Sequence, residues 1–106
     1  MTDTPERFLP LTPLSTSILL AVAGGARHGY AILKELEERG GGVKVPGAGS
    51  LYAALQRLVD EGLLEEQGTE AAEGPPRRCY GLTPLGRDVA RLEVGRLADV
   101  VALAAE

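Results

Sequence analysis

GSLYAALQRLVDEG, residues 49–62, is the stretch that decides the fold of this chain. At about 100° per residue, one side of a helix over these residues collects four apolar side chains, Leu51, Ala54, Leu55 and Leu58. The other side carries Ser50, Ala53, Gln56 and Arg57. Small and hydrogen-bonding side chains are typical of a helix that enters the major groove of DNA, where thymine methyl groups and base edges are read. An ordinary surface helix with few large side chains is the alternative that this stretch alone leaves open.

The composition limits the classes of protein that the chain can represent. With 106 residues it forms one domain with a small core. Hydrophobic residues make up 44% but aromatic residues only 4%, so we expect an aliphatic core that a partner subunit completes. The single cysteine excludes a disulfide framework and a cysteine-rich zinc site. Neither a signal peptide nor a membrane-spanning apolar run is found, so we expect a cytoplasmic protein without membrane contact.

The formal net charge of −4 is unevenly distributed along the chain. Residues 27–57 carry five basic and three acidic side chains, and residues 77–91 carry four basic and one acidic. The segment between them, residues 58–76, holds six acidic side chains and no basic one. Two mildly basic segments therefore flank an acidic one, which permits DNA binding through part of the surface.

Two helices are predicted before the deciding stretch. Thr12 and Pro13 are suited to begin the first, because threonine caps a helix and proline fits its first turn. Gly24 and its glycine neighbour end this helix. The second helix is predicted over residues 29–39, and the glycines at 40–42 end it. In the third helix, Ser50 is expected to act as the cap.

The remaining segments are predicted to form strands, a long last helix and an arm. Residues 63–67 and 77–82 read as the two strands of a hairpin, joined by a polar loop. Residues 43–45 have the pattern of a short strand. Residues 1–11 show no periodicity and contain two prolines, so we expect a flexible arm.

The last helix is predicted to begin with a second threonine-proline pair, Thr83 and Pro84, and to run to the end of the chain. Its apolar stripe extends beyond the edge of so small a domain, and needs another surface to cover it. The order of helix, helix, helix, hairpin and helix is that of a winged helix-turn-helix. We therefore predict a mainly α fold with a small β-hairpin, comprising a winged-helix domain at 12–82 and a C-terminal dimerisation helix at 83–106.

The chain also resembles the PadR family of bacterial transcriptional regulators over about 75 residues. Three blocks carry the resemblance: His28-Gly29-Tyr30 with Ile32-Leu33; Gly49-Ser50-Leu51-Tyr52 with Leu55, Leu58 and Glu61-Gly62-Leu63; and Tyr80-Gly81-Leu82-Thr83 with Gly86-Arg87. The short final helix is similar to the compact class of the family, which dimerises through that helix. The resemblance implies a homodimeric DNA-binding regulator.

The chain departs from the family pattern in the wing. Residues 74–78 carry one base fewer than is usual there, Cys79 stands where an aromatic residue is common, and Gly81 stands where arginine is common. These departures weaken the case for a strong contact between the wing and DNA phosphates. Drug-sensing relatives stack flat ligands on tryptophan, and this chain has none.

Two sets of site residues follow from these patterns. The set expected to contact DNA is Tyr30, Lys34, Lys44, Ser50, Tyr52, Gln56, Arg57, Arg77 and Arg78. Gln56 is the candidate for base readout, because glutamine can bridge two atoms of adenine. The set expected at the dimer interface is Leu14, Ile18, Leu85, Val89, Leu92, Leu97 and Val100.

Other residues with chemical potential have simpler interpretations. His28 is the only histidine and Cys79 the only cysteine, so neither a metal site nor a cofactor is expected. His28 is expected at the start of a helix, and Cys79 as a half-buried filler, with redox sensing as its alternative. Tyr52 is either a tyrosine at the edge of the core or a phosphate ligand. No arrangement typical of a catalytic site is found, so we do not expect an enzyme.

The function that these patterns favour is a transcriptional repressor that binds an inverted-repeat DNA operator as a homodimer. Two alternatives remain: a winged-helix module that binds another protein, which the acidic wing favours, and a small-molecule sensor without direct DNA binding. Any inducer is expected where the final helices meet the first helices. Because tryptophan is absent and there is one phenylalanine, we expect it to be aliphatic or small, or a partner protein.

Overall fold

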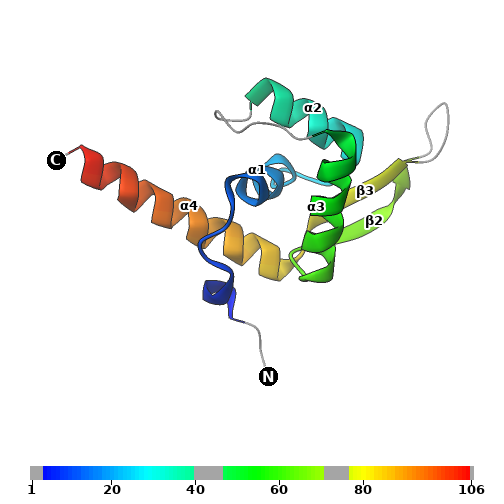
Figure 1. Ribbon diagram of the computed structural model, residues 1–106. Coiled ribbons are helices and arrows are strands. Elements are labelled where there is room, and N and C mark those ends of the chain that lie inside the picture. Colours follow the sequence, from blue (N-terminus) through cyan, green and yellow to red (C-terminus); the bar gives the residue numbers. More distant parts are fainter. Residues whose placement is uncertain (1–3, 40–46, 71–76, 106) are drawn as a thin grey trace.

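The computed structural model describes residues 4–39, 47–70 and 77–105. Its elements in chain order are the 3-10 helix η1 (Pro5–Phe8), α1 (Pro13–Ala21), β1 (Arg27–His28), α2 (Gly29–Arg39), α3 (Ala48–Asp60), β2 (Leu64–Glu70), β3 (Arg77–Leu82) and α4 (Pro84–Ala104). Figure 1 shows α1, α2 and α3 grouped at one end with the β2–β3 hairpin beside α3. Helix α4 runs past α1 and projects away from this group. The fold is mainly helical and has the winged-helix arrangement that the sequence predicts.

The two threonine-proline pairs begin helices as predicted. The hydroxyl oxygen of Thr12 accepts the backbone N–H of Ser15 at 3.1 Å, and that of Thr83 accepts the N–H of Gly86 at 2.9 Å. Thr83 also donates its hydroxyl to the carbonyl oxygen of Gly62 at 2.6 Å. A Cβ on Gly86 would lie 2.0 Å from the carbonyl oxygen of Leu63, so only glycine permits this approach. The first turn of α4 is thus joined firmly to the segment that leads into β2.

Helix α3 begins earlier than expected, and the prediction that Ser50 caps it is wrong. The N-cap is Gly47, whose extended backbone suits that position and which makes no side-chain cap hydrogen bond. Ala48 already lies in the helix, which is compatible with the high helix propensity of alanine. Ser50 is therefore in the first turn, with its side chain exposed.

Over the described residues, the sheet has three strands rather than the two of a simple hairpin. Its order is β1-β3-β2, and β1 pairs antiparallel with β3, with Arg27 opposite Tyr80 and His28 opposite Cys79. Strand β2 continues to Glu70, into a segment expected to be loop. A register irregularity between Glu66 and Thr69 allows this extension. The predicted strand at 43–45 lies outside the described residues.

The core lies where α1, α2, α3, the sheet and the first half of α4 meet. Its fully buried side chains are almost all aliphatic: Ile18, Leu19, Val22, Ile32, Leu51, Leu55, Leu58, Leu63, Leu64 and Val89. Assigning Ile18 and Val89 to the dimer interface is therefore wrong. Both side chains are 0% exposed because α1 and α4 pack against one core within a single chain.

The N-terminal segment is not the flexible arm that the sequence suggests, at least over residues 4–11. Helix η1 packs on α4, and Phe8, Leu9 and Leu11 lie against the core. The backbone N–H of Leu11 donates to the Glu93 carboxylate at 2.8 Å. The apolar residues here are too few and too irregularly spaced to show a periodicity, although they pack.

The second half of α4 leaves the domain. Glu93 is the last buried residue of this helix, and the residues from 94 to 105 are all exposed. Several of them are large and apolar: Val94, Leu97, Val100, Val101 and Leu103. No helix in the described part of the chain is long and apolar enough to cross a membrane.

Candidate nucleic-acid interface

Helix α3 separates its residues into a buried and an exposed side, as its sequence predicts. Leu51, Ala54, Leu55 and Leu58 are buried. The exposed side carries Ser50, Tyr52, Ala53, Gln56 and Arg57. Four of the side chains expected to contact DNA therefore share one accessible helix surface. Within α3, this exposed side carries no large aliphatic side chain that would block the approach of a partner.

Gln56 and Arg57 differ in how they are held. The Gln56 amide nitrogen donates to the Asp60 carboxylate at 3.0 Å, one turn further along the helix. An exposed pair of this spacing stabilises a helix by only about 0.2–0.5 kcal/mol, so Gln56 can exchange Asp60 for another acceptor. Arg57 is exposed, so its positive charge is accessible to a partner.

Tyr52 packs on the backbone of α2 at Gly29. A Cβ built on Gly29 would lie 2.5 Å from Cε1 and 2.9 Å from the hydroxyl oxygen of Tyr52. The ring therefore occupies the space that a side chain at position 29 would need. The Tyr52 side chain is still 45% exposed, so it is both a packing residue and an accessible hydroxyl. The two interpretations of Tyr52 are compatible.

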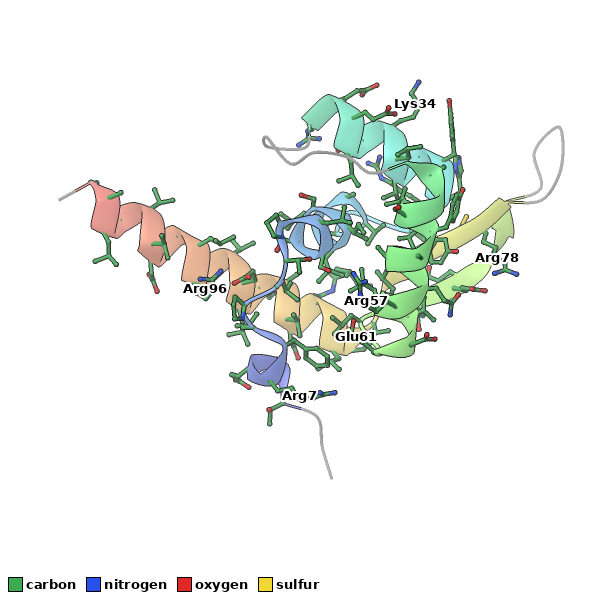
Figure 2. The ribbon with its side chains drawn as sticks, in the orientation of Figure 1. Arg7, Lys34, Arg57, Glu61, Arg78 and Arg96 are labelled. Carbon is green, nitrogen blue, oxygen red and sulfur yellow. The ribbon has the colours of Figure 1, made fainter. Side chains whose placement is uncertain are left out.

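The start of α2 has a histidine cap. Nδ1 of His28 accepts the backbone N–H of Ala31 at 3.1 Å, the role that Ser or Asp plays at other helix starts. The His28 ring lies parallel to Tyr30, with ring centroids 6.4 Å apart. The Lys34 ammonium lies 5.8 Å from the Tyr30 centroid. Tyr30 and Lys34 therefore form one exposed surface on α2. Figure 2 labels Lys34 on this helix.

The wing, which is the β2–β3 hairpin, offers less positive charge to DNA than its arginines alone would give. Arg78 on β3 forms an ion pair with Glu66 on β2 at 3.6 Å, and both side chains are largely exposed. This neighbour neutralises part of the charge that Arg78 offers to a phosphate. Arg77 lies on β3 at the end of the hairpin, and Lys44 lies outside the described residues.

Two further wing residues, Tyr80 and Cys79, differ in their burial. Tyr80 is buried, and desolvation raises the pKa of its phenol. Cys79 is half-buried beside His28 on the neighbouring strand. Among the described residues, no group of three His, Cys, Asp or Glu side chains is placed to hold a metal ion.

Sequence reasoning misses two residues that organise the structure, Gly29 beside α3 and Glu93 on α4. Gly29 was noted only as part of a motif, whereas it makes room for the Tyr52 ring. Glu93 was not noted at all, although its side chain is 1% exposed and bonded to Leu11 and Arg96. The available signal was its position: it stands between Val89 and Leu97, four residues from each, where the helical repeat calls for an apolar residue.

The geometry agrees with comparisons to known proteins. A family model described as "Transcriptional regulator PadR-like family" matches residues 18–92. The chain belongs to this family. The matched residues extend from α1 through the wing into the attached half of α4, and so include all the described elements of the candidate interface.

Two solved structures and one sequence relative show how far the similarity extends. The fold is similar to a PadR family transcription regulator from Clostridium difficile, with a TM-score of 0.75 and 22% identity, covering 87% of this chain and 94% of that one. It is also similar to Bacillus subtilis PadR in complex with operator DNA, with a TM-score of 0.67 and 26% identity, covering 77% and 46%.

The sequence relative is an uncharacterized 37.1 kDa protein in transposon TN4556 of Streptomyces fradiae, 39% identical over 84 residues. These residues are 76% of this chain but only 22% of that protein. The chain thus spans about a fifth of the length of this relative, and the similarity concerns the PadR-like part alone.

Proposed function

We propose that this PadR-like protein is a DNA-binding transcriptional repressor that recognises an inverted-repeat operator as a homodimer. The observation that carries the proposal is the exposed side of α3, which combines small residues with Ser50, Gln56 and Arg57. A helix of this composition can lie in the major groove without steric conflict and can bond to base edges and phosphates. Tyr30, Lys34 and Tyr52 border this surface on α2 and α3.

The second half of α4 supports the homodimer. Leu92, Leu97 and Val100 are 38%, 39% and 50% exposed, although each is a large aliphatic residue. Covering such a stripe against a second copy removes it from water, and obligate dimer interfaces have this apolar character. Leu14 and Leu85 are only partly buried and belong to the same proposed interface. Two copies joined in this way present two α3 helices, as an inverted repeat with half-sites about 34 Å apart requires.

An inducer site is proposed at the junction of the first and last helices. A hollow of about 430 Å³ lies between α1, α2 and α4, and Leu20, Leu36 and Leu97 contribute to its apolar lining. The polar groups of the lining come from Thr16, Ser17, Glu35, Arg39, Glu93 and Arg96, and none of the described lining residues is aromatic. An aliphatic or small ligand fits this lining better than a flat polyaromatic one, which stacks on aromatic rings.

DNA binding is tested with a fluorescent duplex from the region upstream of the gene that encodes the chain. We expect affinity that falls steeply as salt rises, because phosphate contacts release counterions. Arg57→Ala should weaken binding by about 5-fold to 150-fold if its contact is worth about 1–3 kcal/mol. Arg91→Ala is the matched control, since it removes the same charge from an exposed position on α4. Equal losses for both variants would indicate a bulk charge effect and contradict the assignment of α3.

A protein-binding winged helix is the second candidate, and the acidic end of the domain favours it. Asp60 and Glu61 at the end of α3 and Glu65 and Glu66 on β2 are all exposed. A surface of this charge repels DNA and suits a basic protein partner. If the unmodified protein fails to bind any duplex at low salt, this candidate replaces the repressor.

A further inference from the structure

Glu93 is a buried acid in a part of α4 whose neighbours are exposed. Its side chain is 1% exposed, whereas Leu92 and Val94 on either side are 38% and 45% exposed. Moving a carboxylate out of water is unfavourable unless it is fully paired and hydrogen-bonded. The proposed DNA contacts do not involve Glu93, so its burial needs another explanation.

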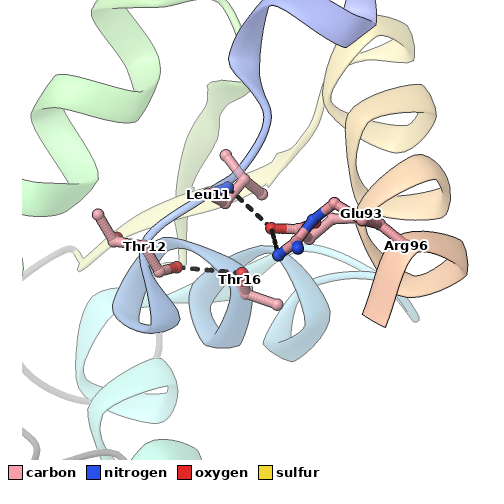
Figure 3. Close-up of polar contacts among 5 residues, drawn as sticks. All are labelled: Leu11, Thr12, Thr16, Glu93 and Arg96. Carbon is pink, nitrogen blue, oxygen red and sulfur yellow. Dashed lines mark hydrogen bonds and ion pairs between the residues drawn. The ribbon is translucent and has the colours of Figure 1, made fainter. Parts of the chain in front are cut away.

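The partners of Glu93 come from two separate segments. Its Oε2 accepts the backbone N–H of Leu11 at 2.8 Å, from a residue 82 positions earlier in the chain. The Arg96 guanidinium donates to both carboxylate oxygens, with Nε bonded to Oε1 and Nη2 to Oε2 at 3.2 Å. Figure 3 shows the Glu93 carboxylate between Leu11, in the segment before α1, and the side chain of Arg96. The hydrogen bonds from Arg96 lower the pKa of Glu93, so the carboxylate is ionised.

This contact ties α4 to the beginning of α1. Leu11 directly precedes Thr12, the cap of α1, and both the N–H and the hydroxyl of Thr16 bond to the Thr12 carbonyl oxygen at 3.0 Å. The position of Leu11 is therefore fixed by the first turn of α1. Glu93 is also the last buried residue of α4. The rest of the helix, residues 94–104, is called its free part, and it leaves the domain at this contact.

We propose that Glu93 is a positioning residue that fixes the direction of the free part of α4 and thereby the half-site spacing that the dimer accepts. The inference rests on the proposed function, because the spacing matters only if the two copies join through α4 and bind DNA. The free segment from 94 to 104 is about 16 Å long at 1.5 Å per residue. A tilt of about 10° at Glu93 moves its far end by about 3 Å, close to the 3.4 Å between successive base pairs.

A purely stabilising role predicts a different result. If the Glu93 contact only adds stability, weakening it should lower the affinity for every spacing by the same factor. If the contact sets the direction of the free part of α4, weakening it should change the preference of the dimer among half-site spacings. Each added base pair also rotates one half-site by roughly 35° about the DNA axis, so a rigid dimer accepts few spacings.

The test uses duplexes whose two half-sites are separated by spacers that differ by single base pairs. We expect the unmodified protein to prefer one spacing by about 10-fold or more, which is the order of the cost of one mismatched base pair. For Glu93→Leu and Glu93→Gln we expect the preference to fall to about threefold or less. Asp88→Leu and Asp88→Asn are the controls, since they remove an exposed carboxylate from the same helix and should keep the original preference. Because Glu93→Leu could fail to fold, Glu93→Gln and Arg96→Gln provide milder changes to the same contact.

A measurement without DNA separates this inference from the proposed function. Spin labels attached through Glu61→Cys, in a Cys79→Ser background, report the distance between the ends of the two α3 helices in the dimer. We expect one narrow distance distribution for the parent and a broader or displaced one for the Glu93 variants. Unchanged distances and an unchanged spacing preference would overturn the role of Glu93. If the distances change in the Glu93 variants but the parent dimer binds no duplex, the proposed function is contradicted and the positioning role of Glu93 is not.

Discussion

Helix α3 and the free part of α4 both carry apolar residues at helical spacing, but these residues are buried in α3 and exposed in α4. In α3 the apolar residues Leu51, Leu55 and Leu58 are 0–1% exposed, and the accessible side is polar or small. In α4 the apolar residues Val101 and Leu103 are each 69% exposed. The apolar side of α3 is buried by other parts of the same chain, and that of the free part of α4 is not. The first therefore offers a surface to a polar partner, and the second to an apolar one.

The difference arises from where each helix lies in the fold. Helix α3 contacts α1, α2 and β2, so its apolar side has neighbours on every side. Helix α4 contacts α1, η1 and β3, and its residues are exposed from Val94 onward, because the domain ends near Glu93. Hydrophobic periodicity shows that a side needs covering, and only the three-dimensional arrangement shows whether the same chain can cover it.

The largest expected effect comes from a charge on the free part of α4. Leu97→Glu should turn the dimer into monomers at micromolar concentration, since each dimer loses two buried leucines at about 1.5–3 kcal/mol each. A total of about 3–6 kcal/mol weakens association by 100-fold or more. Sedimentation velocity measures this directly, and Asp99→Asn is the control on the same segment. If the parent protein is already a monomer, the proposal that the free part of α4 binds a second copy is contradicted.

The sequence predicts those parts of the fold that depend on local chemistry. Both threonine-proline starts are confirmed, because a hydroxyl cap and a proline in the first turn act within four residues. The two sides of α3 are predicted correctly because a single periodicity defines them. The start of α3 is missed, because Gly47 and Ser50 are both acceptable caps and the choice depends on the backbone before the helix.

Contacts between distant segments could not be predicted in this way. Strand β1 has two residues and exists only because β3 lies beside it. Ile18 and Val89 are apolar in either setting, so their burial in the core rather than at an interface depends on how α1 and α4 pack. Glu93 was overlooked because its bond to Leu11 joins residues 82 positions apart.

The second expected effect tests how much the Glu93 contact, at the end of the buried part of α4, stabilises the fold. Glu93→Gln should lower the free energy of unfolding by about 1–3 kcal/mol near neutral pH, since a charged acceptor is replaced by a neutral one. Because Arg96 lowers the pKa of Glu93 in the folded state, this stabilisation is present above the ordinary pKa of 4.5 and is lost as the pH falls through the lowered folded pKa. Urea unfolding from about pH 7 to about pH 3 measures the trend. The parent and the variant should converge in acid, and a constant difference would contradict an ionised Glu93.

A smaller effect tests how the accessible side of α3 is supported. Gly29→Ala should destabilise the fold by about 1–2 kcal/mol, because the new Cβ overlaps the Tyr52 ring. In a Tyr52→Ala background the same change should be neutral or stabilising, since alanine favours a helix over glycine by up to about 1 kcal/mol. The sign of the effect is thus expected to reverse between the two backgrounds. Thermal unfolding of the four proteins measures it, and equal effects in both backgrounds would mean that Tyr52 can move aside freely.

The smallest expected effect concerns the histidine that begins α2. His28→Ala should lower the free energy of unfolding by about 1 kcal/mol, because the N–H of Ala31 loses the Nδ1 acceptor that caps the helix. His28→Asn is the matched variant, since its side-chain oxygen can accept a hydrogen bond at the same helix position. It should recover most of the loss although it removes the ring that lies beside Tyr30. If His28→Asn is as destabilised as His28→Ala, the ring contact matters more than the cap. Helix α2 would then depend on its outer aromatic surface, which would make it resemble the free part of α4 more than α3.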